Sequence, residues 1–114
     1  MNEIEKLYEN AGVEPVLFYD CESYNQKVEK GYLFTAEKQL ELIKWLGELD
    51  LIEIMRTVGE EKDWIISSRY DISEGIYHFV SRNKSFDNAL AILINNLWQN
   101  LTEEEKEQIR GILE

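Results

Sequence analysis

The widest gap in the charge pattern lies between Asn88 and Thr102, where no side chain is ionisable in a chain that is 31% charged. At about 100° per helical residue, the apolar residues of segment 86–101 share one broad arc, formed by Phe86, Leu90, Ala91, Leu93, Ile94, Leu97, Trp98 and Leu101. The opposite side carries amides, namely Asn88, Asn95, Asn96, Gln99 and Asn100. A solvated face usually carries Lys and Glu instead. The pattern predicts a central helix of one small domain, or a helix whose amide side meets a partner or a second copy.

Helical spacing also marks three other segments. Residues 2–11 place apolar side chains on one face, and Gly12 follows as a C-terminal stop. Thr35 is a typical N-cap for a helix that ends near Gly47. Thr102 and Glu105 have the spacing of a capping box, which predicts a last helix over 102–113 and explains the acidic triplet 103–105 without any function.

The middle of the chain changes to a strand-like period. Residues 49–58 and 63–70 are rich in β-formers, are separated by the turn-like segment 59–62, and are followed by a third such run at 76–81. These runs are apolar on both faces, so the sheet is either covered on both sides or keeps one face for a partner. An earlier apolar run at 16–19 predicts one more strand after Pro15, and the polar segment 20–32 predicts a mobile loop.

These elements predict a single α+β domain over residues 1–114. We expect a three- or four-stranded, mainly antiparallel sheet with helices packed on one face, these being the second, third and fourth helices. The second and third helices should form the core with four strand residues, Ile52, Ile54, Trp64 and Ile66. Ser85 is expected to cap the helix over 86–101.

Charge narrows the classes of partner. The chain has 23 acids, 12 bases and a net charge of −11, so nucleic acids and anionic lipids are disfavoured as direct partners and a basic protein surface is favoured. No apolar run approaches the ~18 residues of a membrane span, and the N-terminus does not resemble a secretory signal. These features predict a cytoplasmic protein.

Candidate catalytic residues are few. Cys21 and His78 are the single cysteine and histidine, and neither lies in a recognisable catalytic motif. Glu60, Glu61 and Lys62 have the Glu-x-Lys spacing of some metal-dependent nucleases, but they fall in a predicted turn of an acidic chain. We therefore expect no catalytic activity, no metal and no cofactor.

Two blocks resemble a known set of proteins. Residues 34–46 (FTAEKQLELIKWL) and 91–113 (AILINNLWQNLTEEEKEQIRGIL) are similar to a recurrent set of small uncharacterised proteins encoded by bacteriophages and prophages. The resemblance covers about a third of the chain. It implies a phage accessory gene product that acts in the bacterial host cell, and it supplies no catalytic residues.

Three functional hypotheses remain open. The first is an acidic module that binds another protein. The second is an inhibitor that imitates nucleic acid and occupies the basic groove of a host defence nuclease, and the third is a small metal-dependent hydrolase. The candidate partner-binding carboxylates are Glu37, Glu41 and Glu48 on the second helix and Glu60, Glu61 and Asp63 at the tip of the strand pair. If contact is apolar instead, Tyr77 and Phe79 are the candidates.

Overall fold

The computed structural model describes residues 2–20, 27–49, 52–60, 62–72 and 75–114. Its elements are α1 (Glu3–Ala11), β1 (Val16–Asp20), β2 (Lys27–Gly31), α2 (Ala36–Leu49), β3 (Ile52–Arg56), β4 (Trp64–Ile72), β5 (Gly75–Asn83), α3 (Phe86–Leu97), the short 3-10 helix η1 (Trp98–Asn100) and α4 (Glu103–Leu113).

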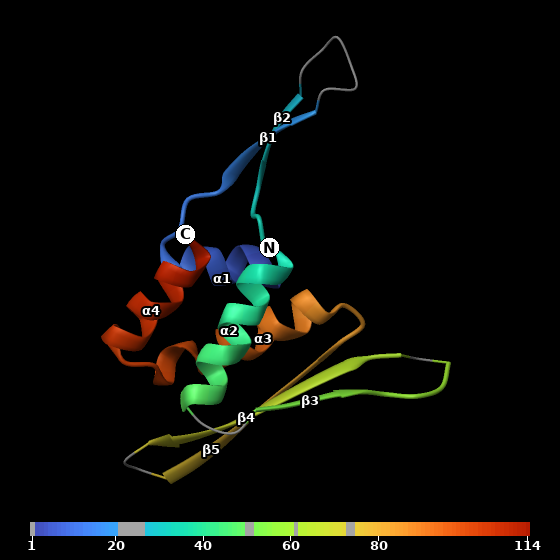
Figure 1. Ribbon diagram of the computed structural model, residues 1–114, viewed down its shortest axis with the longest axis vertical. Helices are drawn as coiled ribbons and strands as arrows, with labels where there is room; N and C mark the ends of the chain where they lie inside the picture. Colours follow the sequence, from blue (N-terminus) through green and yellow to red (C-terminus); the bar gives the residue numbers. More distant parts are fainter. Residues whose placement is uncertain (1, 21–26, 50–51, 61, 73–74) are drawn as a thin grey trace.

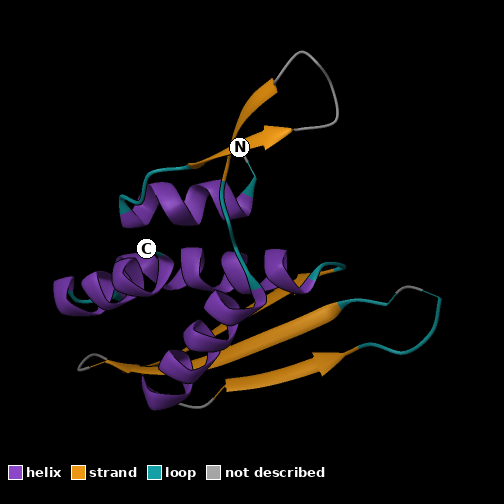
Figure 2. Cartoon of the chain, turned by 45° about the horizontal axis from the view of Figure 1, so that its top comes forward, coloured by secondary structure: helices purple, strands orange, loops and turns teal. Residues whose placement is uncertain are grey.

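Strands β3, β4 and β5 form an antiparallel sheet in that order, and the helices lie on one face of it (Figures 1 and 2). Helix α3 packs over β4 and β5, while α2 meets β3. This arrangement confirms the predicted α+β fold with helices on one face. One expectation needs correction: α4 packs mainly against α1 and α2 and so lies further from the sheet than predicted.

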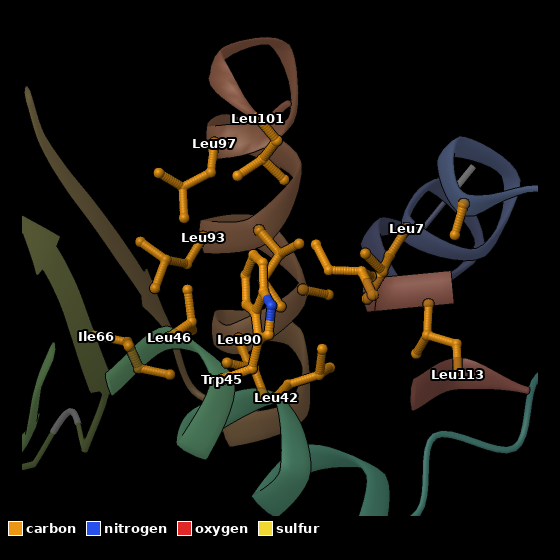
Figure 3. Packing of buried hydrophobic residues seen from close by; sticks show 14 of the residues in the cluster. Leu7, Leu42, Trp45, Leu46, Ile66, Leu90, Leu93, Leu97, Leu101 and Leu113 are labelled. Atoms are coloured by element: carbon orange, nitrogen blue, oxygen red, sulfur yellow. The ribbon is translucent and has the colours of Figure 1, made fainter. Parts of the chain in front are cut away.

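Helix α3 is the centre of the core, as its uncharged sequence predicts. Leu90, Leu93, Ile94 and Leu97 are fully buried. Their neighbours come from the other layers of the molecule, in particular Leu7 of α1, Leu42, Trp45 and Leu46 of α2, Ile66 of β4, and Leu113 of α4 (Figure 3). An apolar arc surrounded in this way cannot tolerate an ionisable side chain without a partner.

The predicted strand contribution to the core is correct for three residues and wrong for one. Ile66 is fully buried, and Ile52 and Trp64 are half-buried against the core. Ile54, in contrast, is 40% exposed. It lies on the edge strand β3, where α2 covers the beginning of the strand around Ile52 and does not extend over its middle.

Local signals set most helix ends. The Thr102 hydroxyl accepts from the Glu105 amide (3.2 Å), and the Glu105 carboxylate accepts from the Thr102 amide (2.8 Å), which confirms the capping box. Thr35 accepts from the Lys38 amide (3.3 Å). Ser85 is a correction, because its hydroxyl bonds the Asp87 carboxylate and makes no cap bond.

A two-stranded arm made of β1 and β2 extends away from the helices (Figure 1). The strand predicted over 16–19 is present and includes Asp20, and the loop predicted over 20–32 is wrong for 20 and for 27–31, which pair with β1. Main-chain pairing explains the difference, since a polar segment can form a strand when an adjacent strand supplies its hydrogen bonds. The expected mobile tip and Cys21 fall in residues 21–26, outside the described residues.

Tyr8 fixes the base of this arm to the helical layer. Its side chain is 1% exposed, and its hydroxyl donates a 2.8 Å hydrogen bond to the Leu33 carbonyl. Its ring packs against Tyr32 at 4.8 Å between centroids. Burial disfavours the charged phenolate and raises the pKa of Tyr8 to about 12.

Candidate functional site

The structure places the predicted carboxylates of α2 in solvent. Glu37, Glu41 and Glu48 are all exposed, and Glu41 pairs with Lys44 at 3.9 Å on the same helix face. An exposed ion pair of this length contributes little. These three side chains are therefore available for contact with another molecule, as expected.

Helix α4 continues the same acidic surface. Glu103, Glu104, Glu107 and Glu114 are exposed on or just after it. It is held against α2 by two polar contacts: the Trp45 indole donates to the Gln108 side chain (2.7 Å), and the Lys38 ammonium donates to the Leu113 carbonyl (2.7 Å). We call α2, α4 and Glu114 the acidic helix pair.

A groove of about 300 Å³ lies where the two helices meet, and three carboxylates line it, Glu37 and Glu41 from α2 and Glu114 from the end of α4. The acidic helix pair holds eight acids against four bases. Most of these bases already have partners within the pair: Lys38 bonds Leu113, and Arg110 lies 3.2 Å from Glu114. The pair therefore presents an excess of negative charge to solvent.

The tip of the strand pair is less acidic than predicted. Glu60 is exposed, but Asp63 is 9% exposed and accepts a 2.7 Å charged hydrogen bond from Arg82 of β5. The Asp63 amide also donates to the Thr57 hydroxyl (2.8 Å). The expectation that Asp63 projects into solvent is wrong, since it closes the β3–β4 loop onto β5. Glu61 lies outside the described residues.

The aromatic candidates belong to β5. Phe79 is half-buried, pairs with Ser68 of β4 in register, and packs against the core, so it is not the exposed apolar contact that was expected. Alternation along β5 puts it on the side facing the helices. Tyr77 pairs with Tyr70 in the same register, and its side chain lies outside what the structure describes.

His78 lies on the other side of β5 and is exposed. It borders a shallow hollow of about 100 Å³ together with Glu53, Ser67, Ser68 and Arg69. Within the part of the chain that the structure describes, no group of three or more His, Cys, Asp or Glu side chains is arranged to hold a metal ion. The acid nearest to the Glu-x-Lys segment, Asp63, is engaged by Arg82.

The structure explains the amide side of α3 in a way that spacing alone did not. Asn95 is 8% exposed and faces α1. Its amide nitrogen donates to the carbonyl and the carboxylate of Glu3, both at 2.9 Å, and its oxygen accepts from Asn10 at 3.3 Å. The amide side of α3 is thus partly occupied by hydrogen bonds within the domain. The polar residues of segment 2–11 were the feature of the sequence that could have indicated this contact.

Charge is distributed unevenly between the layers, which composition alone did not reveal. Residues 52–84, which contain the three-stranded sheet, hold six of the 23 acids and five of the 12 bases. This segment is close to neutral, so nearly all of the net charge of −11 lies in the rest of the chain. The molecule has an acidic helical side and an almost neutral sheet.

No protein-family model matches the chain, and comparison with curated proteins and with solved structures finds no similar protein. None of the helices in the described ranges combines the length and apolar character of a membrane span.

Proposed function

We propose that this protein is a non-catalytic binding module whose acidic helix pair binds a basic surface of another protein. The observation that carries the proposal is the exposure of carboxylates on two adjacent helices, with most of the local bases bonded within the pair. Such a surface attracts a basic partner over long range and speeds its association. The resemblance of two sequence blocks to phage and prophage proteins suggests a bacterial partner inside the host cell.

A second candidate uses the same surface. In a nucleic-acid mimic, the carboxylates would take the place of phosphates in the basic groove of a host nuclease. The observation favouring it is the groove in which carboxylates of both helices meet, Glu37 and Glu41 with Glu114. The two candidates differ in one outcome: the mimic must compete with DNA or RNA for its partner, whereas a general protein-binding module need not.

The experiment compares three immobilised proteins in a bacterial lysate. The variant E41K/E48K reverses two exposed carboxylates of the acidic helix pair, and the control E9K/E14K makes the same charge change at exposed positions outside it. A partner retained by the wild type and the control, but lost by E41K/E48K, supports the proposal. Equal retention by all three proteins contradicts it.

The purified partner then allows a kinetic test. Charge reversal in the acidic helix pair should slow association by about ten-fold or more at low salt, because steering depends on complementary charge. Added salt should weaken wild-type binding, since screening acts over about 8–10 Å at physiological ionic strength. An affinity that does not change with salt would refute a charge-driven contact. Displacement of the partner by duplex DNA would identify the mimic.

A further inference from the structure

One face of the three-stranded sheet has no covering layer among the described residues. The helices all lie on the opposite face, as both views show (Figures 1 and 2). By strand register, the described side chains on the outer face are Glu53 and Met55 of β3, Ile65, Ser67 and Arg69 of β4, and His78, Val80 and Arg82 of β5.

The outer face is apolar in its middle. Met55 is 52% exposed, Val80 is 59% exposed, and Ile65 is half-buried between them in the strand order. Met55 pairs with Ile65 in the register, and Val80 lies diagonally next to Ile65, so the three side chains adjoin. Contiguous apolar side chains on a sheet face are typical of a contact surface.

The charge distribution restricts what can cover this patch. Two copies of a chain with net charge −11 repel each other wherever their helical sides approach. The segment 52–84 is nearly neutral, so contact between outer faces places the acidic sides of the two copies away from each other. Contact between sheets is thus the arrangement in which identical copies meet with the least repulsion.

The charges on the outer face also complement their own rotated copy. Among the side chains described on this face, the acid is Glu53 on β3, whereas Arg69 lies on β4 and Arg82 on β5 at the other edge of the sheet. A two-fold axis parallel to the strands places β3 of one copy over β5 of the other. The register puts Glu53 level with Val80, so this axis brings Glu53 over Val80 of the second copy, next to its Arg82, on both sides of the axis.

We infer that the outer face is a self-association surface and that the occupant is a second copy of this chain, packed sheet against sheet. Aligned sheets pack at about −30° and about 10 Å apart, with the inner side chains interdigitated. Ile65 on the middle strand lies nearest the two-fold axis, and Met55 and Val80 lie on either side of it. The inference is independent of the proposed function, because the acidic helix pair stays exposed on both sides of the dimer.

Sedimentation velocity over a range of protein concentrations tests the inference. The wild type should shift with concentration from 13.5 kDa towards twice that mass. Val80→Glu should raise the dimer dissociation constant by at least about ten-fold, since the new carboxylate of each copy would be buried against Glu53 of the other. A wild type that stays monomeric at all concentrations overturns the inference.

Two matched variants identify the surface. Leu40→Glu makes a charge change like that of Val80→Glu at a 51% exposed apolar position on α2, and it should dimerise like the wild type. Ile54→Glu alters the helix-facing side of the edge strand β3 and should also dimerise. Loss of the dimer in Ile54→Glu alone would indicate edge-to-edge pairing and overturn the sheet-face contact. Loss in Leu40→Glu would overturn it as well.

Folding and salt provide the remaining readouts. Met55→Glu changes a second side chain of the same patch, so it replaces Val80→Glu if circular dichroism shows that the latter does not fold. Dimerisation should change little with salt, because screening weakens both the repulsion between the acidic helical sides and the attraction between Glu53 and the basic side chains of the second copy. Binding of a basic partner to the acidic helix pair should weaken as salt is added. The response to salt therefore distinguishes a failure of the dimer from a failure of the proposed function. A dimer that dissociates as salt increases would contradict an apolar contact.

Discussion

The helical layer and the three-stranded sheet expose different kinds of surface. The helices bury a continuous apolar core and expose carboxylates, so their outer side repels negatively charged molecules. The sheet is nearly neutral, and its uncovered face leaves Met55 and Val80 more than half exposed. The difference indicates that stability comes mainly from the helical layer, while the sheet has surface that folding of one chain does not use.

The largest expected effect tests this division directly. Leu93→Ala should lower the free energy of unfolding by about 2–5 kcal/mol, because Leu93 is fully buried in α3 and the loss of transfer energy adds to a cavity. Met55→Ala, at an exposed position of β3, should change it by less than about 0.5 kcal/mol. Urea unfolding at a concentration where the protein is monomeric measures both. Similar losses in the two variants would refute the division.

An intermediate effect concerns pH and the helical layer alone. The Tyr8 phenol has an ordinary pKa of 10.0 when unfolded and about 12 when folded, so the folded state holds its proton more tightly. The stabilisation that this pKa difference gives to the folded state is complete below pH 10 and is lost as the pH rises from about 10 to 12. We expect the wild type to lose up to about 2–3 kcal/mol more than Tyr8→Phe over this interval.

Unfolding in urea at several alkaline pH values measures this loss. Tyr8→Phe also removes the hydrogen bond to Leu33, so it should begin less stable at neutral pH. The informative quantity is therefore the slope of stability against pH in each protein. Parallel slopes would show that Tyr8 ionises as freely in the folded state as in the unfolded chain.

The smallest effect separates local from tertiary stabilisation within the helical layer. Thr102→Ala removes the acceptor for the Glu105 amide and should cost about 1 kcal/mol. Ser85→Ala is the matched control at the start of α3, where the hydroxyl makes no cap bond, and it should cost less. Equilibrium unfolding distinguishes the two. If Ser85→Ala costs as much, capping does not explain the Thr102 effect.

These elements also show which parts of the fold the sequence could predict. Helices α3 and α4 were predicted because their signals are local: an uninterrupted apolar arc in one, and a capping box in the other. The predicted end of the first at 101 was wrong, because α3 ends at Leu97 and continues as the 3-10 helix η1. Strand β2 was missed because Lys27–Gly31 has little apolar character and depends on pairing with β1. Ile54 was wrongly placed in the core, because alternation shows which residues share a face but not how far a helix covers it.

The candidate site was predictable only in part, for a related reason. Exposed carboxylates on a helix follow from spacing, so Glu37, Glu41 and Glu48 were placed correctly in solvent. Asp63 was not, since its partner Arg82 lies 19 positions away and is brought near by the β4–β5 pairing. The role of Asn95 likewise depends on α1, which is separated from it by most of the chain.

That separation has a consequence for how the protein is made. The contacts of α1 with Asn95 join residues 85 and 92 positions apart. At about 5–20 residues per second of synthesis, Glu3 and Asn10 remain without their partner Asn95 for roughly 5–20 s, whereas Tyr8 can meet Tyr32 and Leu33 much sooner. Helix α1 therefore completes its packing only after α3 has been synthesised, and until then the side of α1 that faces α3 lacks its final contacts.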